Sequence, residues 1–398
     1  MNALHDAGSD PSQVSERNGP RGGQDLLELV LRHDPRPAVP TGGGRPIGVV
    51  GAGAIVRAGH LPAYRKAGLR VVAVADVNAD TARAVANEFG IETAYGSADQ
   101  LLADPRVEVV DIAVTPEAQA EIALAAIAAG KHVLCQKPFA EDLATAGALV
   151  DAAERAGVAL AVNQQMRWDQ VIACMKGLVD AGWYGALTSG LFDVDVMTDW
   201  RSWPWMLDKP RLEYYYHSIH YVDAIRYVFG EPVSVVASVG RYPGQAARGE
   251  TRTTTVYEYS GELSVVVLAN HNNWSARPRA VVRCQGTAGQ SEGTLGVLYD
   301  YPVGRPDTFT YWSRDTHPDH VFSRTFEERW IPDAFVGPMA DLQAAIDERR
   351  APLTSGRDNL RTLRVVEAAY RAAEQGRRVR VHEVPLPGAS VSATQTGG

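Results

Sequence analysis

The chain has only three cysteines in 398 residues, and Cys135, Cys174 and Cys284 lie far apart in the sequence. An odd number of widely spaced cysteines gives neither a disulfide framework nor a zinc knuckle. The sequence also lacks any apolar run approaching the ~18 residues of a membrane-spanning helix. We therefore expect an enzyme of a reducing compartment, with a cytoplasmic location and no membrane partner.

Basic residues are fewer than acidic ones. The sequence has 39 lysines and arginines and 47 aspartates and glutamates, which gives a formal net charge of -8 at pH 7. Binding to nucleic acid requires a basic face, so we expect no nucleic-acid partner. The 45% of hydrophobic residues is typical of a folded globular protein and excludes global disorder. The length predicts two or three domains.

Glycine, proline and polar residues dominate both ends of the chain. We predict a mostly disordered tail at residues 1–44, with one short amphipathic helix at 26–31, and a loose tail at 383–398. An arm that packs on a partner subunit is the alternative for the first tail. From 45 to 163, near-continuous apolar strands alternate with helices, which is typical of a parallel sheet covered on both faces.

The pattern changes after residue 163. Most of 187–312 consists of strand-like runs separated by turn pairs, which is typical of antiparallel hairpins. Helices are expected at about 170–181, 218–229, 338–349 and 358–375. We therefore predict an α/β protein whose second domain, at 164–382, is of α+β type and whose last helices can pack back on the first domain.

A glycine-rich turn, Gly51-Ala52-Gly53, follows the first predicted strand, and a helix follows from Ala54 and Ile55. Such glycines let backbone N–H groups approach a pyrophosphate at the positive end of a helix. The next strand runs into Asp76, whose carboxylate can bind a ribose diol and would repel a 2′-phosphate. We therefore predict dinucleotide binding, with NAD preferred over NADP. A plain strand–helix turn is the alternative, and Val56 stands where the usual fingerprint has a third glycine.

The segment Lys131–Pro138 reads KHVLCQKP. It resembles the AGKHVLxEKP stretch of the Gfo/Idh/MocA family, which includes glucose–fructose oxidoreductase and inositol dehydrogenase. The resemblance spans about residues 45–382 and includes the glycine-rich turn, Thr115-Pro116, the segment 163–167, and His220 with Asp223. It implies a Rossmann domain at 45–163, then a domain with an open-faced, mainly antiparallel sheet that holds a sugar or polyol against the nicotinamide. It also implies a homo-oligomer, a dimer or tetramer, assembled through that sheet.

The resemblance implies two principal catalytic residues. Lys137 matches the lysine of the Glu-Lys-Pro motif, whose ammonium can hydrogen-bond the reacting oxygen and favour its alkoxide. His220 matches the histidine of a substrate-domain helix, and imidazole suits the role of proton acceptor because it titrates near neutrality. A surface lysine and a polar structural histidine are the alternatives.

Two positions depart from the family pattern. Gln136 stands where the family has glutamate, so no carboxylate stabilises the charge of Lys137, and we hypothesise that the pKa of this lysine falls. Tyr216 stands four residues before His220, where the family has aspartate, and is a weaker acid–base group or a packing residue. His217 can face the same pocket and assist catalysis.

Further contacts are predicted around these residues. The cofactor-binding set is Gly51, Gly53, Ala54, Ile55, Asp76, Thr115, Pro116, Gln136 and Lys137. The substrate-binding set is Asn163, Arg167, Trp203, His217 and His220. Asn163 and Arg167 follow the last strand of the parallel sheet, where ligands bind, although a salt bridge is the alternative for Arg167. Trp203 belongs to a tryptophan cluster that can stack on a sugar, and core packing or a subunit contact is its alternative.

Histidines three residues apart also invite a metal interpretation for His217 and His220 with Asp223. An H-x-x-H pair without the glutamate of H-E-x-x-H is weak evidence, so we predict no metal site.

The sequence thus predicts an NAD-dependent oxidoreductase that transfers hydride between the nicotinamide and a hydroxyl or carbonyl carbon of a sugar, cyclitol or glycoside. The departures at Gln136 and Tyr216 keep two alternatives open. One is a redox-neutral enzyme with internal NAD cycling, such as a lyase, an epimerase or a glycoside-cleaving enzyme. The other is a non-catalytic, nucleotide-sensing regulator.

Overall fold

The computed structural model describes residues 30, 38–301 and 303–387. The predicted helix at 26–31 and most of the two predicted tails lie outside these residues. Residues 38–44 contact the folded chain, since the Gly43 carbonyl accepts a hydrogen bond from the Arg70 N–H at 3.0 Å. At the other end, Gly147 approaches Pro387 so closely that an added Cβ would lie 2.5 Å from the proline ring. The inner ends of both predicted tails are therefore packed.

Six parallel strands form the first sheet, in the order β3-β2-β1-β4-β5-β6. They are β1 (Ile47–Val50), β2 (Val71–Ala75), β3 (Thr93–Tyr95), β4 (Val109–Ile112), β5 (His132–Cys135) and β6 (Leu160–Val162). Every residue of β1 and β4 is buried, as expected for strands covered on both faces. The predicted parallel sheet, covered on both faces, is confirmed.

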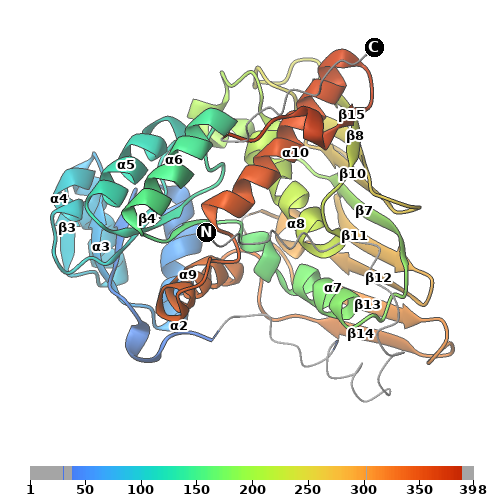
Figure 1. Cartoon of the computed structure of the whole chain (residues 1–398), viewed down its shortest axis with the longest axis horizontal. Helices are drawn as coiled ribbons and strands as arrows, with labels where there is room; N and C mark the ends of the chain where they lie inside the picture. Colours follow the sequence, from blue (N-terminus) through green and yellow to red (C-terminus); the bar gives the residue numbers. More distant parts are fainter. Residues whose placement is uncertain (1–29, 31–37, 302, 388–398) are drawn as a thin grey trace, which may run out of the picture.

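Helices cover both faces of this sheet (Figure 1). Ile47 and Val49 share a core cluster with α2 (Leu61–Ala67), α3 (Ala79–Phe89) and α9 (Val336–Glu348). Val50 points to the other face and shares a cluster with α4 (Ala98–Leu102), α5 (Pro116–Ala128) and α6 (Leu143–Ala156). The alternation of side chains along β1 thus distributes the helices between two layers, and α9 brings the C-terminal part of the chain back to this sheet.

The second sheet has nine strands in the order β14-β13-β12-β11-β7-β10-β9-β8-β15. They are β7 (Leu187–Asp195), β8 (Ser234–Gly240), β9 (Arg252–Glu258), β10 (Ser264–Asn270), β11 (Arg279–Gly286), β12 (Gly289–Thr294), β13 (Thr308–Ser313), β14 (Val321–Thr325) and β15 (Val379–Arg380). All neighbours pair antiparallel except β7 and β10, which are parallel. The predicted mainly antiparallel sheet is therefore confirmed.

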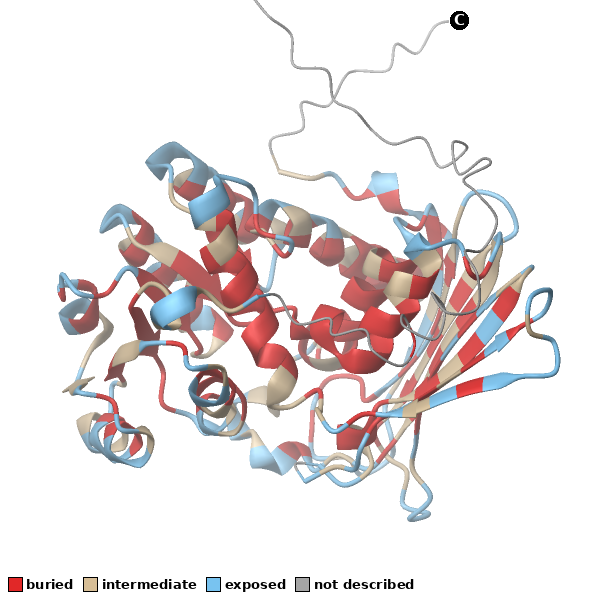
Figure 2. Cartoon of the chain, turned by 90° about the horizontal axis from the view of Figure 1, so that it is seen from below, coloured by how far each residue is buried: buried red, intermediate tan, exposed pale blue. Residues whose placement is uncertain are grey.

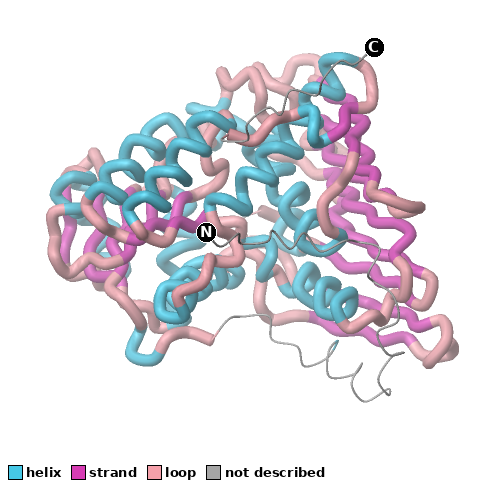
Figure 3. The backbone as a smooth tube through the Cα atoms, viewed as in Figure 1, coloured by secondary structure: helices cyan, strands magenta, loops and turns pink. Residues whose placement is uncertain are grey.

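One face of this sheet packs on the helices and the other stays open (Figures 2 and 3). Along β10, buried residues alternate with partly exposed ones. The inner face lies towards α7 (Gln170–Asp180), α8 (Ile219–Phe229) and α10 (Gly356–Gln375), which occupy the space between the two sheets (Figure 1). Within the described residues, no helix combines the length and the apolarity needed to cross a membrane.

A buried ion pair joins the parallel sheet to α8. Arg167 lies in the 3-10 turn directly after β6, and its Nε is 2.7 Å from Oδ2 of Asp223 on α8. A second guanidinium nitrogen contacts Asp223 Oδ1 at 2.7 Å and also pairs with Asp358 at the start of α10. The third donates to the Leu353 carbonyl at 2.8 Å. Arg167 thus fixes α8 and α10 relative to the end of β6.

Removing one side of this pair should destabilise the protein strongly. The variant Asp223→Ala leaves the buried Arg167 guanidinium short of its main counter-charge, and we expect a loss of about 3–5 kcal/mol in the free energy of unfolding. Chemical denaturation of wild type and variant measures this loss. The control is Arg357→Ala, which breaks an exposed pair with Glu154 and should cost less than about 1 kcal/mol. Equal losses in the two variants would contradict the structural role of the buried pair.

Candidate active site

The glycine-rich turn lies at the carboxyl end of β1. Gly51 has a φ of 104°, and an added Cβ would lie 2.3 Å from the Ala113 carbonyl oxygen, so this position requires glycine. Gly53 is exposed, and a Cβ there would meet no atom within 4 Å. The open space beside Gly53, with Ala54 and Ile55 starting the following helix, fits the approach of a pyrophosphate.

Asp76 is held beside this turn. One carboxylate oxygen accepts a hydrogen bond from the Ala52 N–H at 2.9 Å, and the other accepts one from the Asn78 N–H at 2.9 Å. The structure thus places Asp76 next to the glycine-rich turn, as binding of an adenosine ribose at this edge requires.

The loop that carries Lys137 follows β5 and is clamped by α5. Thr115 and Pro116 begin α5, and Gln119, one turn further along, is buried. The Gln119 amide nitrogen donates to the carbonyls of Gln136, Pro138 and Phe139 at 2.8, 3.0 and 3.1 Å. The Lys137–Pro138 peptide bond in this loop is cis.

The Lys137 side chain reaches from the parallel sheet to the second domain. Its Nζ donates a hydrogen bond to the Tyr216 carbonyl at 2.6 Å. Tyr216 lies in the π-helical turn Tyr214–Ser218, which leads directly into α8. Burial lowers the pKa of Lys137 to about 8. The contact therefore brings a lysine with a lowered pKa next to the helix that carries the candidate histidines.

A buried polar chain, which the sequence analysis did not identify, supports this loop. His60 Nδ1 lies 2.7 Å from Asp111 Oδ2, and the Tyr64 hydroxyl donates to the same oxygen at 2.7 Å. Gln136 Nε2 lies 2.9 Å from His60 Nε2, while Gln136 Oε1 accepts from the Lys137 N–H at 2.7 Å. Asp111 is an acid within the otherwise apolar strand β4, a sequence signal that points to a buried polar partner.

The buried polar chain gives the neutral amide of Gln136 a role as a hydrogen-bond donor to His60. Its oxygen is occupied by the Lys137 N–H, so its NH₂ group faces His60 and must donate to Nε2. His60 then carries its proton on Nδ1 and donates it to Asp111. A glutamate at position 136 would offer His60 no such donor unless the carboxyl group were protonated.

The two candidate histidines lie on consecutive turns. His220 is buried on α8 and packs edge-to-face against Trp330, with ring centroids 5.0 Å apart. Burial and then the charges of Lys137 and His217 lower the pKa of His220 well below its ordinary value. Burial and then the neighbouring His271 lower the pKa of His217 to about 4, although Glu213 opposes this shift. Both imidazoles are therefore neutral at pH 7, and each has one ring nitrogen without a proton.

The remaining predicted residues are placed differently. Asn163 is buried, and its amide nitrogen lies 3.3 Å from His60 Nε2. The donors of Arg167 contact Asp223, Asp358 and Leu353, so the described contacts of this arginine correspond to the salt-bridge alternative. The Tyr216 hydroxyl is bound to Glu141, and burial followed by this contact raises the pKa of Tyr216.

Trp203 belongs to an aromatic group near these residues. Its ring centroid lies 6.3 Å from that of Trp200 and 6.0 Å from that of Tyr301. Trp200 in turn packs edge-to-face on His271 at 5.1 Å. Trp203 remains partly exposed, as a side chain that stacks on a ligand must be.

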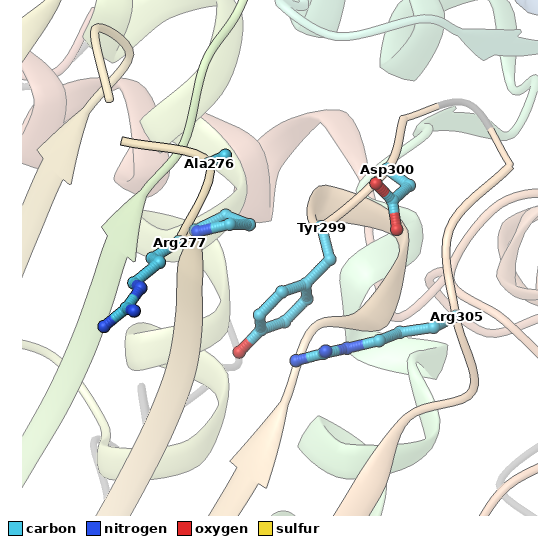
Figure 4. Close-up of a pocket in the computed structure, with 6 residues that line it drawn as sticks. Ala276, Arg277, Tyr299, Asp300 and Arg305 are labelled. Atoms are coloured by element: carbon cyan, nitrogen blue, oxygen red, sulfur yellow. The ribbon is translucent and has the colours of Figure 1, made fainter. Parts of the chain in front are cut away.

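A separate pocket lies between the turn at 276–278 and the loop at 299–305 (Figure 4). Its lining includes Arg305, whose guanidinium carbon lies 3.3 Å from the centroid of the Tyr299 ring. None of the residues that line it belongs to the predicted catalytic, cofactor or substrate sets. We therefore do not assign this pocket to the candidate active site.

Comparisons with known proteins match both halves of the chain. The model described as "Oxidoreductase family, NAD-binding Rossmann fold" matches residues 45–164, and the model described as "GFO/IDH/MocA C-terminal domain" matches residues 172–291. A D-apiose dehydrogenase of Paraburkholderia graminis is 30% identical over 88% of this chain and 93% of its own length. A myo-inositol 2-dehydrogenase of Thermotoga maritima is 26% identical over 85% of this chain and 99% of its own length.

The fold has solved counterparts. A crystal structure of an oxidoreductase from Agrobacterium radiobacter, in complex with NAD⁺, L-tartaric acid and magnesium, superposes with a TM-score of 0.75. It covers 86% of this chain and 100% of that chain at 24% identity. The likeness establishes a shared fold.

The effect of the neutral Gln136 on the pKa of Lys137 can be tested by titrating this lysine. In Gln136→Glu, a carboxylate next to Lys137 favours the ammonium form, and we expect the pKa of Lys137 to rise from about 8 by up to about one unit. An NMR titration of lysine labelled at Cε measures both values. Gln375→Glu, at the exposed end of α10, is the control and should leave Lys137 unchanged. The same Lys137 pKa in wild type and Gln136→Glu would refute the hypothesis.

Proposed function

The chain belongs to the Gfo/Idh/MocA family of oxidoreductases, and from this premise we propose that it is a dehydrogenase of a sugar, cyclitol or glycoside. The family predicted from the KHVLCQKP segment is thereby confirmed. The relatives named D-apiose dehydrogenase and myo-inositol 2-dehydrogenase support a polyol or sugar as the substrate.

One observation carries this proposal: the Lys137 ammonium contacts the turn that precedes His220. A substrate hydroxyl between the two groups would meet a hydrogen-bond donor that stabilises the alkoxide and a neutral imidazole that accepts the proton. NAD, when bound, takes up or supplies the hydride at the nicotinamide ring. Lys137 orients and polarises the reacting oxygen, and His220 holds the proton, with His217 and Tyr216 as neighbouring groups.

We propose NAD rather than NADP as the cofactor. The Asp76 carboxylate lies beside the glycine-rich turn, where it would repel a 2′-phosphate. Val77, which follows Asp76, is 96% exposed and offers no positive charge to bind such a phosphate. Gly51, Gly53, Ala54, Ile55, Thr115, Pro116 and Gln136 complete the proposed cofactor contacts.

Substrate binding is proposed for Asn163, Trp203, His217 and His220, whereas Arg167 is proposed to act through its ion pair with Asp223.

The domain boundaries, the homo-oligomer formed through the open sheet and the cytoplasmic location stay predictions. Several apolar side chains on the second sheet are more than a third exposed, among them Val236, Val239, Trp312 and Val321, which supports a subunit contact there.

Steady-state kinetics with NAD and a panel of sugars, cyclitols and glycosides test the function through the absorbance of the reduced nicotinamide. We expect NADH to accumulate with at least one substrate.

We also expect kcat/KM to fall as the pH rises through about 8, because Lys137 then loses the charge that stabilises the alkoxide. Lys137→Ala should lower kcat/KM by about 10²–10⁴.

Lys66→Ala is the control for the lysine variant, since Lys66 is exposed and pairs with Asp333 on the surface. It should leave kcat/KM unchanged. Turnover without net accumulation of NADH would favour a redox-neutral enzyme with internal NAD cycling over a dehydrogenase. NAD binding without turnover on any substrate would favour the nucleotide-sensing regulator.

A further inference from the structure

Three side chains that are able to ligate a metal converge next to the candidate site. Glu213 and His217 lie one helical turn apart before α8, and His271 directly follows β10. One potential ligand atom from each lies within 4.8 Å of the other two. In the part of the chain that the structure describes, no other three histidine, cysteine or acidic side chains converge in this way.

Two of the three distances within this cluster are close to those between ligands of one ion, and the third lies within 4.8 Å. His271 Nε2 lies 3.5 Å and His217 Nδ1 lies 3.7 Å from Glu213 Oε1. N–H···O hydrogen bonds are shorter, at roughly 2.7–3.2 Å. Ligands about 2.0–2.2 Å from a tetrahedral zinc ion lie about 3.4 Å from one another, so the two distances to Glu213 Oε1 are already near those of a zinc site.

Two of these ligand atoms lack partners of their own. His217 Nδ1 and His271 Nε2 are both buried and make no hydrogen bond. Glu213 and His271 are fully buried, while the His217 side chain is 18% exposed. Buried polar atoms are normally hydrogen-bonded, so two nitrogens that face one buried carboxylate at ion-pair distance without a hydrogen bond require an explanation.

The neighbouring hydroxyl groups orient these ligands. Thr198 Oγ1 lies 2.8 Å from His271 Nδ1, and an N–H donated to it leaves the lone pair of Nε2 directed towards Glu213. Ser218 donates a hydrogen bond to Glu213 Oε1, and Thr253 donates one to Glu213 Oε2 at 3.0 Å. Hydrogen bonds of this kind fix ligating imidazoles and carboxylates in metal sites.

We propose that Glu213, His217 and His271 bind one divalent transition-metal ion of the zinc class. Two imidazoles and one carboxylate suit zinc or cobalt, whereas magnesium and calcium prefer oxygen ligands throughout. Three protein ligands leave a fourth position for water or a substrate oxygen. The partial exposure of His217 places that position on the open side of the cluster.

These three ligands differ from the group that the sequence suggested, which was His217 and His220 with Asp223. Asp223 is bound to Arg167 and is not available to a metal. His271 lies far from Glu213 in the sequence, so no local spacing reveals the cluster. With an ion bound, His217 acts as a ligand and His220 remains the proton acceptor. The proposal does not depend on the dehydrogenase activity, since metal binding is measured without substrate.

Titration of the chelator-treated full chain with Zn²⁺ and Co²⁺ tests the site. For wild type we expect one Zn²⁺ per chain by calorimetry, and a Co²⁺ complex with the intense visible absorption of four-coordinate cobalt. His217→Ala and Glu213→Gln should each weaken Zn²⁺ binding by more than about a hundredfold, since even an outer-shell change costs 10–100-fold. Mg²⁺ should not compete.

His382→Ala, which removes an exposed histidine outside the cluster, is the control and should bind Zn²⁺ as wild type does. Circular dichroism of the metal-free variants checks that each is folded, and His217→Ala should disturb the core least, because the His217 side chain is partly exposed. Wild type that binds no Zn²⁺ or Co²⁺ overturns the proposal. A folded His217→Ala that binds Zn²⁺ as tightly as wild type overturns it as well.

Discussion

The buried ion pair between Arg167 and Asp223 determines where the candidate site forms. It ties the end of β6, the last strand of the parallel sheet, to α8 of the second domain. Because His220 lies one turn before Asp223 on α8, the same pair sets the distance between this histidine and the edge of the sheet. Arg226 and Asp358 extend the pair to α10, so three elements meet at one buried group of charges. The Lys137–Tyr216 contact spans the same junction.

A second constraint is the buried polar chain beneath the Lys137 loop. Asp111 interrupts an apolar strand, and contacts with His60 and Tyr64 satisfy its buried Oδ2. Through Gln136, that chain reaches the backbone N–H of Lys137. The amide at position 136 completes the chain without adding a charge, so burial lowers the pKa of Lys137 with no adjacent carboxylate to oppose it.

Much of the fold was predictable because its signals are local. Continuous apolar runs predicted the alternation of strands and helices over 45–163, whereas β3, with only three residues, gives a weak signal of its own. Within the strand-rich range 187–312, the signal of β12 is weak, because glycine and polar residues fill this strand and reduce its alternation. The parallel pairing of β7 with β10 depends on how distant segments meet, which spacing does not encode.

The site was predictable only where a motif marks it. Lys137, Gln136 and His220 were found through the resemblance, and Asp76 through its place after a strand. His60 and Asp111 were missed because their partners are distant in sequence, although an aspartate inside a buried strand was a usable signal. Arg167 was ambiguous for the same reason, since only the structure brings Asp223 and Asp358 to it.

Hydride exchange between the nicotinamide and a substrate carbon held between Lys137 and His220 can be followed with an isotope. A substrate deuterated at the carbon that bears the reacting hydroxyl is used, and the NADH is isolated after a single turnover. We expect deuterium at C4 of the nicotinamide and a slower hydride-transfer step than with unlabelled substrate. NADH without deuterium at C4, or substrate consumed with no label passing through the cofactor, would contradict this hydride exchange.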